Sequence, residues 1–353
     1  MPRQIHQILP YLTYSDAIGN LALELRHLFQ EWGYPSEIFA ENWDRRLAKE
    51  CHSYLEYGRY SRADNLLILH YSTGGETNRF VLDVPDQIVV YYHNITPPHY
   101  FDRVNGMLAQ SLREARRDIE HLVHRAPAIC DSPYNRQELE KMGFQILGVV
   151  PPILTFDHLD GTRNTLGQEK HGATDWLHVG RLAPNKCIHD IIKTFYYYHI
   201  RIASRSRLFL VGSWEGLEPY VNDLRQLIAR LDLGESIMLT GRVDSLVEFY
   251  RMADVYLSMS EHEGFCIPLI EAMYFDLPVL AYASTGVPAT LGDAGVLIQH
   301  KAYPVIAEMV HEIIADEKLR GRLIQNQRAR LAAFAPDVVR AQLRACLDLA
   351  FRL

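Results

Sequence analysis

Two kinds of hydrophobic pattern follow one another along the N-terminal half of the chain. Residues such as Leu21, Leu25 and Leu28 recur at the spacing of an amphipathic helix, which Gly33 would end. Between such stretches, short apolar runs of strand character lie at 4–9, 35–40, 66–71, 88–93, 128–131 and 144–150. Strands that alternate with helices predict a parallel sheet covered by helices on both faces.

The same alternation begins again after an interruption. Pro151, Pro152 and a polar, glycine-containing run at 157–175 predict a loop-rich crossover. Beyond it, the pattern predicts strands at 176–180, 208–212, 237–241, 255–259 and 279–282, and helices at 188–198, 220–231, 245–251, 269–275, 305–316, 317–334 and 337–351. The predicted fold class is α/β, with two Rossmann-like doubly wound parallel-sheet domains, 1–152 and 153–336, facing a central cleft.

The composition is ordinary for two soluble domains. Of 353 residues, 48% are apolar and 22% are charged, and the formal net charge of −7 gives no electrostatic reason to expect a nucleic-acid partner. The five cysteines are scattered without a Cys-x-x-Cys pair, so neither a disulfide framework nor a zinc site is indicated. With no signal-peptide pattern and no apolar window of about 18 residues, a cytoplasmic location is expected.

One short segment between two predicted strands concentrates the candidate chemistry. Residues 261–273 read EHEGFCIPLIEAM, and Pro268 suits the first position of a helix. Glu263 would then lie on the loop and Glu271 in the first helical turn. Because such a loop lies at the carboxyl edge of a parallel sheet, both carboxylates are expected in a ligand crevice beside a helix N-terminus.

This segment resembles the donor-site motif of retaining glycosyltransferases of family 4, the group 1 transferases, which have the GT-B architecture. Their motif is typically EGFGxPxxEAM, and residues 263–273 read EGFCIPLIEAM, with Cys266 at a frequent glycine position. The resemblance implies that Glu263 orients the transferred sugar and that Glu271 accepts hydrogen bonds from the ribose. It also implies donor binding by Gly264, Phe265, Cys266 and Ile267. Asp276 stands at a second frequent glycine position.

A second motif follows the first predicted strand of the C-terminal half. Residues 180–186 read GRLAPNK, which is similar to the family's Gly-Arg-Leu-x-x-x-Lys segment. Arg181 and Lys186 lie just past a strand end, where a guanidinium and an ammonium suit a diphosphate. The chain has no Asp-x-Asp pair, so these cations are expected to compensate the diphosphate charge in place of a metal. The resemblance adds Gly180 and Val243 to the donor-binding residues, with Val243 beside the nucleobase.

Two loops of the N-terminal half carry further candidates. Gly19 either allows close approach of the donor at a helix start or simply forms a strand–helix turn. His93 ends a strand, and the resemblance implies that it reaches the transferred sugar, whereas His70 either shapes an acceptor pocket or is structural. Some aromatic residues either stack on acceptor sugars or belong to the core, namely Tyr11, Tyr14, Tyr71, Tyr100 and Phe101. Mixed charges at 112–127 indicate a solvated helix or, alternatively, a weak dock for an anionic membrane.

These features, together with the resemblance to family 4, imply a metal-independent retaining glycosyltransferase that needs no cofactor. Its catalytic residues would be His93, Glu263, Arg181 and Lys186. It would move a hexose from a UDP- or GDP-linked donor to a glycan or lipid-linked acceptor, in cell-surface polysaccharide synthesis in the cytoplasm or at the inner face of the membrane. Two alternatives keep the fold: a sugar-nucleotide-binding pseudo-enzyme and a sugar-nucleotide epimerase. By resemblance, the final helix at 337–353 completes the first domain, and domain closure is required for turnover.

Overall fold

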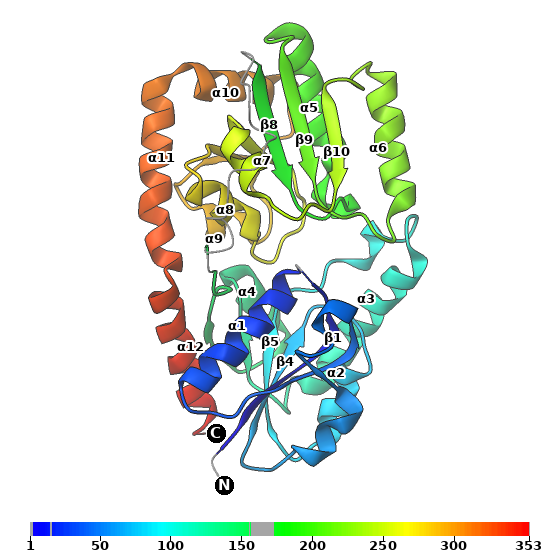
Figure 1. Cartoon of the computed structure of the whole chain (residues 1–353), viewed down its shortest axis with the longest axis vertical. Coiled ribbons are helices and arrows are strands. Elements are labelled where there is room, and N and C mark those ends of the chain that lie inside the picture. The colour runs from blue at the N-terminus through cyan, green and yellow to red at the C-terminus, as the bar shows by residue number, and fades with distance from the viewer. Residues whose placement is uncertain (1–2, 15, 155, 157–172, 353) are drawn as a thin grey trace. The chain divides into compact units, whose positions relative to one another are not determined.

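Alternating strands and helices form two separate parallel sheets, one in each of two units of the chain (Figure 1). The computed structural model describes residues 3–14, 16–154, 156 and 173–352, so most of the predicted crossover at 157–175 lies outside the described residues. Unit 1 comprises Met1–His99, Gly106–Leu154 and Phe334–Leu353, and unit 2 comprises Tyr100–Asn105 and Thr155–Ala333. The predicted α/β fold class, with one doubly wound parallel sheet in each half, is confirmed.

The division into units differs from the predicted domains by a few residues at the boundaries and in one internal segment. The predicted boundary at 152/153 lies two residues before the observed one, but Tyr100–Asn105 packs with unit 2. Val104 lies against the hydrophobic core of unit 2, and Asn105 Nδ2 donates to the carbonyl of Gly216 at 2.9 Å. These two contacts explain why a short segment within the N-terminal half belongs to the second unit.

The sheet of unit 1 has seven strands in the order β3-β2-β1-β4-β5-β6-β7, and every neighbouring pair is parallel. The strands are β1 Ile5–Leu12, β2 Ile38–Trp43, β3 His52–Ser53, β4 Leu66–Tyr71, β5 Gln87–Tyr92, β6 Ala128–Cys130 and β7 Ile146–Val149. The helices are α1 Ala17–Glu31, α2 Thr77–Phe80, α3 Gly106–Asp118, α4 Pro133–Met142 and α12 Pro336–Ala350. Because the strand order reverses between β1 and β4, a ligand site is expected at their carboxyl ends.

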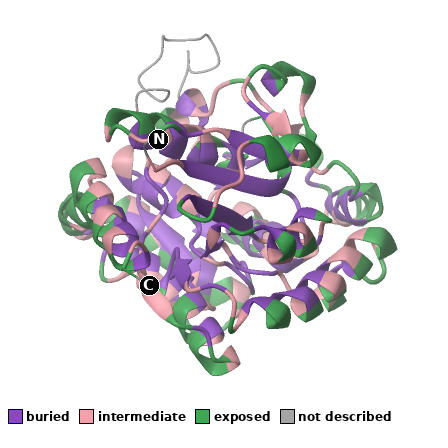
Figure 2. Cartoon of the chain, turned by 90° about the horizontal axis from the view of Figure 1, so that it is seen from below, coloured by how far each residue is buried: buried purple, intermediate pink, exposed green. Residues whose placement is uncertain are grey.

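The hydrophobic core of unit 1 includes α12, the last helix of the chain. Leu25 of α1 packs in one cluster with Val339 and Leu343 of α12 and with inward side chains of the sheet. Gly148 of β7 permits this approach, because a Cβ there would lie 2.5 Å from Cys346 Sγ. Figure 2 shows that the strands are buried and that the outer faces of the helices are exposed. The C-terminal helix therefore belongs to unit 1, although it follows unit 2 in the sequence.

The charged segment at 112–127 forms a shorter helix than predicted. α3 ends at Asp118, and a 3-10 helix, Ile119–Leu122, follows it. Arg116 of α3 donates to the carboxylate of Glu138 and to the backbone of unit 1, so this cation is engaged within the protein. Among the residues that the structure describes, no helix has both the length and the apolar composition that a membrane crossing requires.

The sheet of unit 2 has six parallel strands in the order β10-β9-β8-β11-β12-β13. The strands are β8 Thr174–Val179, β9 Ser206–Val211, β10 Ile237–Gly241, β11 Val255–Ser258, β12 Val279–Tyr282 and β13 Val296–Ile298. The helices are α5 Ile188–Arg201, α6 Glu218–Arg230, α7 Val247–Met252, α8 Ile267–Tyr274, α9 Val287–Leu291, α10 Tyr303–Ala315 and α11 Glu317–Leu331. Here the strand order reverses between β8 and β11, so the loops that follow these two strands meet at one edge of the sheet.

Candidate functional site

The loop between β11 and α8 carries Glu263 and turns sharply before the helix. Cys266, the last loop residue, has φ 73° and ψ 67°, a left-handed conformation that glycine adopts without strain. Asp276, just beyond α8, has φ 54°. Both residues stand where the motif that this segment resembles frequently has glycine. The chain therefore keeps the backbone turns of that motif with other side chains in place.

Glu263 and Lys186 form a buried ion pair between two loops of unit 2. Lys186 ends the 3-10 helix Pro184–Lys186 that follows β8, and its Nζ lies 2.6 Å from both carboxylate oxygens of Glu263. The two side chains are only 21% and 8% exposed. Burial opposes ionisation of Glu263, but the ammonium of Lys186 outweighs it and holds the pKa of the carboxyl below its usual range. Burial also opposes the charge of Lys186, whose pKa is raised overall by the carboxylate of Glu263.

Asn185 joins the two loops beside this ion pair. Its Nδ2 donates to the carbonyl of His262 at 3.0 Å, and its own carbonyl accepts from the N–H of Glu261 at 2.8 Å. Asn185, next to Lys186, therefore connects its loop to the residues just before Glu263. This role could not be predicted from the sequence, because a single asparagine in a loop has no characteristic pattern.

Thr285, in the loop after β12, fixes the backbone of Glu263. Its Oγ1 accepts from the N–H of Glu263 and donates to the carbonyl of the same residue, each at 2.8 Å. Gly286 N–H donates to that carbonyl at 3.0 Å, and a Cβ on Gly286 would lie 2.0 Å from the carbonyl oxygen of Gly264. The other predicted donor-binding residues of this motif follow directly in the loop and in the first turn of α8, namely Phe265, Cys266 and Ile267.

Glu271 is the fifth residue of α8 and lies in its second turn, not in the first turn as predicted. Its Oε2 accepts from the hydroxyl of Tyr250 at 2.6 Å. Burial, together with Glu271, raises the pKa of Tyr250 well above its usual value, so this hydroxyl stays protonated and donates. Burial also raises the pKa of Tyr256, and both Glu263 and Glu271 raise it further. The two acids thus lie close enough to β11 to act on the same side chain.

Gly180 and Arg181 follow β8, at the same edge of the sheet. Gly180 has φ 150°, and Arg181 Nη2 donates to the carbonyl of Glu215 at 3.1 Å. The charge of Arg181 opposes that of Lys186 and lowers its pKa, which indicates that the two cations are close. Val243 follows the edge strand β10, which is separated from β8 by β9. The structure therefore groups Arg181 with the ion pair and places Val243 farther along the edge.

Gly19 lies in the first turn of α1 in unit 1. Asp16 caps this helix by accepting from the N–H groups of Ile18 and Gly19. A Cβ on Gly19 would lie 2.6 Å from the carbonyl oxygen of Thr13. Close packing of the preceding loop on the helix therefore accounts for the glycine, which favours the interpretation as a strand–helix turn.

His93 follows β5 in unit 1, and its side chain is only 4% exposed. Its Nε2 lies 2.9 Å from Nδ1 of His70, and its Nδ1 lies 3.6 Å from Oδ2 of Asp131. His70, which the sequence left open between an acceptor-pocket role and a structural one, is a buried neighbour of His93. The role of His93 as a contact for the transferred sugar stays a prediction.

The aromatic side chains considered for acceptor stacking differ in their exposure. Tyr71 and Phe101 are buried, and the hydroxyl of Tyr71 donates to a backbone carbonyl at 2.8 Å, so both belong to the core. Tyr11 and Tyr14 are 51% and 43% exposed. Tyr100 is half-buried, and its hydroxyl donates to Oε2 of Glu261 at 3.4 Å. Tyr11 and Tyr14 are therefore the most exposed of these five residues.

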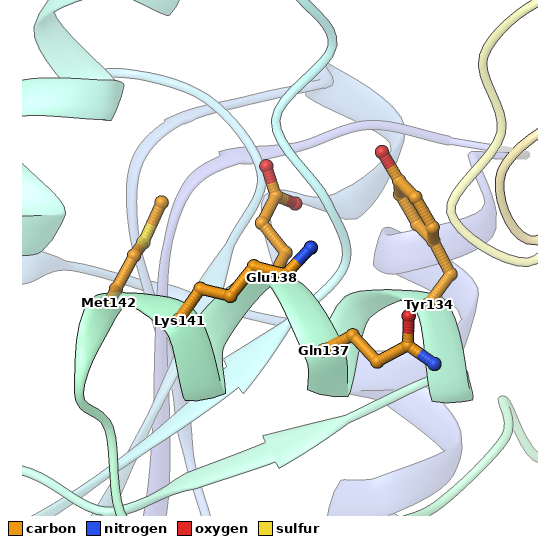
Figure 3. A pocket seen from close by; sticks show the side chains of 5 residues that line it. All are labelled: Tyr134, Gln137, Glu138, Lys141 and Met142. Atoms are coloured by element: carbon orange, nitrogen blue, oxygen red, sulfur yellow. The ribbon is translucent and has the colours of Figure 1, made fainter.

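A hollow of ≈ 360 Å³ on unit 1 is lined by none of the predicted site residues (Figure 3). Its lining comes entirely from α4, namely Tyr134, Gln137, Glu138, Lys141 and Met142. The carboxylate of Glu138 already accepts from the hydroxyl of Tyr92 at 2.8 Å and from Asn94 Nδ2 at 3.0 Å. This hollow therefore offers no group of charges comparable to the one in unit 2.

Residues 167–330 match the family model described as glycosyl transferases group 1. Over these residues, which are less than half of the chain, the protein is similar to the group 1 glycosyl transferases. It is 28% identical over 156 residues to the capsular polysaccharide biosynthesis glycosyltransferase CapM of Staphylococcus aureus. This match covers 44% of this chain and 40% of CapM. It is 26% identical over 160 residues to the N-acetyl-alpha-D-glucosaminyl L-malate synthase of Bacillus anthracis, covering 45% and 40%. The matches thus span well under half the length of both relatives.

The fold of this chain is also similar to a solved structure over nearly its whole length. The structure of Anabaena Alr3699/HepE in complex with UDP-glucose matches with a TM-score of 0.76 at 16% identity. The match covers 98% of this chain and 100% of that chain. At this identity, the likeness supports the two-sheet architecture and not a particular substrate.

Three side chains of unit 2 have potential metal-ligand atoms within 4.8 Å of one another, those of Cys187, His189 and Asp190. The ammonium of Lys301 already lies 2.8 Å from Asp190 Oδ2 and 2.9 Å from Glu261 Oε1. Burial raises the pKa of Cys187 to about 11, so its thiol stays protonated near neutral pH. A lysine thus supplies the positive charge here, and it also holds the loop two residues before Glu263.

His178 of β8 is a buried residue beside the ion pair that the sequence did not single out. Its Nδ1 lies 3.0 Å from the carbonyl of Leu257, which can only accept, so Nδ1 carries the hydrogen. Its Nε2 is buried and has no hydrogen-bond partner among the described residues. Burial, reinforced by the charge of Lys186, lowers the pKa of His178 to about 4. The ring is therefore neutral near neutral pH, with an acceptor at Nε2.

This pKa predicts a loss of stability in mild acid. The folded-state pKa lies below the unfolded value of 6.5, so stability is fully present above that pH and falls as the pH approaches about 4. His178 alone should reduce the free energy of unfolding by about 3 kcal/mol over this interval. Urea denaturation at about pH 7 and about pH 4.5 should show a smaller acid-induced loss for His178→Asn, which retains a donor toward Leu257.

His300→Asn provides the matched control, because His300 is an exposed histidine of the same unit. Its acid-induced loss should equal that of the wild type. An identical pH dependence for His178→Asn and the wild type would contradict the assignment of a buried neutral ring to His178.

Proposed function

We propose that this chain is a metal-independent retaining glycosyltransferase that transfers a hexose from a nucleotide-diphosphate sugar. The observation that carries the proposal is the buried pair of Lys186 and Glu263 at the edge of unit 2 where the strand order reverses. A buried ion pair adds little net stability, because the loss of hydration offsets the Coulomb attraction. Two buried charges, with Arg181 close by, are therefore better explained by the binding of a charged ligand.

The proposed chemistry follows from where charge develops during transfer. Breaking the bond between the sugar and the diphosphate puts positive character on the anomeric carbon and negative charge on the leaving group. Arg181 and Lys186 would stabilise the leaving diphosphate, and Glu263 would orient the sugar hydroxyls beside the cationic centre. Glu271 would accept hydrogen bonds from the ribose, and His93 would contact the transferred sugar. The protein cations would take the place of a metal at the diphosphate.

For the donor we propose a UDP- or GDP-linked hexose, and for the acceptor a glycan or a lipid-linked saccharide of cell-surface polysaccharide synthesis. UDP-glucose, the ligand in the Alr3699/HepE structure, is one member of the proposed donor class, but that likeness itself supports only the fold. The name of CapM supports a capsular polysaccharide product. The name of the Bacillus anthracis relative includes L-malate, so acceptors among the relatives are not all glycans. The donor is therefore proposed more narrowly than the acceptor.

The backbone of the donor motif favours turnover over simple binding. The case for a pseudo-enzyme rested on Cys266 and Asp276 at frequent glycine positions. Both residues adopt the left-handed conformation that glycine would adopt. Because the turns on either side of α8 are kept, these two substitutions give no reason to expect that catalysis has been lost.

A screen of sugar nucleotides tests the proposed function directly. We expect one UDP- or GDP-hexose to raise the melting temperature and to be cleaved slowly, with release of the nucleotide, because binding stabilises the folded state. EDTA should leave the release rate unchanged. Product analysis by NMR should show a retained anomeric configuration. No stabilisation and no release with any sugar nucleotide would refute the proposal, and conversion of the donor sugar without nucleotide release would indicate an epimerase.

Removing either member of the ion pair should lower the rate strongly. Lys186→Met and Glu263→Gln should each reduce the rate of nucleotide release by at least about 100-fold, the size expected for a lost electrostatic stabiliser. Each single variant should also be less stable, because it leaves an unpaired buried charge. The double variant should regain stability but not activity, which separates the two effects. Lys318→Met, an exposed lysine of unit 2, is the control, and near-normal rates in both single variants would exclude the assigned roles.

Glu271 should act on nucleotide binding more than on the chemical step. Glu271→Gln removes a charged acceptor, so calorimetry should show an affinity for the nucleotide that is lower by about 10-fold or more. The single-turnover rate at saturating donor should change much less. Tyr250→Phe removes only the hydrogen bond that holds Glu271 and should weaken binding by a smaller factor. Unchanged nucleotide affinity in Glu271→Gln would rule out a ribose contact.

A further inference from the structure

Four buried polar side chains form a continuous series across unit 1. Gln7 lies on β1, His70 on β4, His93 directly after β5 and Asp131 directly after β6, and these strands are neighbours in the sheet. Oε1 of Gln7 lies 2.9 Å from Nε2 of His70, and Nδ1 of His70 lies 2.9 Å from Nε2 of His93. Nδ1 of His93 faces Oδ2 of Asp131 at 3.6 Å. The series therefore links the first strand of the unit to the residue proposed to contact the sugar.

The direction of these hydrogen bonds follows from the amide of Gln7. Its Nε2 donates at 2.9 Å to the carbonyl of Ala22, which can only accept. Gln7 therefore presents its oxygen to His70, so that Nε2 of His70 carries a hydrogen. Burial, together with the neighbouring His93, holds the pKa of His70 well below its usual value, and the ring is neutral near neutral pH. Nδ1 of His70 is then an acceptor, and the hydrogen between the two rings belongs to Nε2 of His93.

The far end of the series is held by α4. Oδ1 of Asp131 accepts from Asn135 Nδ2 at 2.5 Å, and Oδ1 of Asn135 accepts from Asn94 Nδ2 at 2.8 Å. Asn94, which directly follows His93, has φ 78°. Asn135 thus connects the carboxylate beside the ring of His93 with the next residue of the chain. The ring is consequently hydrogen-bonded to His70 at Nε2 and faces the carboxylate of Asp131 at Nδ1.

We propose that His70 is a positioning residue that keeps a hydrogen on Nε2 of His93 and fixes the orientation of its ring. It accepts the Nε2 hydrogen of His93, so that Nδ1 is the only ring nitrogen of His93 not committed to the other histidine. Gln7 acts one step earlier, because it determines which nitrogen of His70 carries the hydrogen. The inference rests on the proposed role of His93 in transfer, but the arrangement of hydrogens is a property of unit 1 alone.

Two substitutions at His70 separate its acceptor atom from its bulk. His70→Phe keeps a ring but removes the acceptor, and kcat for nucleotide release should fall by at least about 10-fold. His70→Asn places an amide oxygen near the former position of Nδ1 and should restore most of the activity. Nucleotide affinity by calorimetry should stay unchanged in both, because the proposed nucleotide contacts lie in unit 2. His6 is a buried histidine of β1 outside this series, and His6→Phe should leave kcat unchanged.

The hydrogen positions can be measured without any substrate. In histidine labelled with nitrogen-15, long-range proton–nitrogen correlation near neutral pH should show hydrogen on Nε2 of His70 and none on its Nδ1. The same spectrum should show hydrogen on Nε2 of His93. Spectra of His70→Asn and His93→Gln assign the signals. This measurement applies to the wild-type protein, so it holds even if His70→Phe does not fold.

The outcomes distinguish this inference from the proposed function. Hydrogen on Nδ1 of His70 would overturn the inference, and so would a normal kcat in His70→Phe or equal losses in the Phe and Asn variants. If the wild-type protein cleaves no sugar nucleotide, the proposed function fails, while the spectrum still decides the arrangement of His70 and His93. The expected spectrum with rescue by Asn supports both.

Discussion

The pairing of Lys186 with Glu263 is the interaction on which the site in unit 2 depends. Burial opposes the charge of each group, and each is held in its charged form by the other. The attraction compensates for lost hydration only while the two groups stay in contact, so the loops after β8 and β11 must be held at a fixed separation. Asn185 provides that constraint through hydrogen bonds to the backbone just before Glu263, and Thr285 through hydrogen bonds to Glu263 itself. The ion pair therefore requires rigid loops, and the hydrogen bonds of Asn185 and Thr285 provide that rigidity.

Much of this arrangement follows from patterns that are visible in the sequence. Alternation of strands and helices predicts two parallel sheets, and strand ends place Lys186 and Glu263 at one edge although 77 positions separate them. The side chains that hold them could not be predicted in the same way. Thr285 and Tyr250 lie 22 and 21 positions from their partners, Glu263 and Glu271, and only the folded chain selects those pairings. The same holds for Tyr100–Asn105, whose assignment to unit 2 depends on a few tertiary contacts.

Glycine positions show where a rule based on residue type reaches its limit. Cys266 and Asp276 adopt the left-handed backbone although neither is glycine, so a turn is preserved where the sequence suggests a departure. Gly19 shows the reverse case, because its missing side chain makes room for the backbone of Thr13 and needs no ligand to explain it. In both cases the surrounding structure, and not the identity of one residue, determines the conformation. A motif comparison reads these positions correctly only when the backbone angle is known.

In both units, a backbone carbonyl determines which atoms of a buried polar cluster donate hydrogen bonds and which accept them. A carbonyl can only accept, so Ala22 orients the amide of Gln7 and Leu257 determines which nitrogen of His178 carries the hydrogen. In unit 1, the orientation of Gln7 sets the hydrogen position of His70, which in turn sets that of His93. In unit 2 it leaves Nε2 of His178 as a buried acceptor on which the charges of Lys186 and Glu263 both act. The hydrogen positions of these histidines are thus determined by main-chain carbonyls, which do not titrate. A site built this way keeps the same donors and acceptors while the side chains around it change charge.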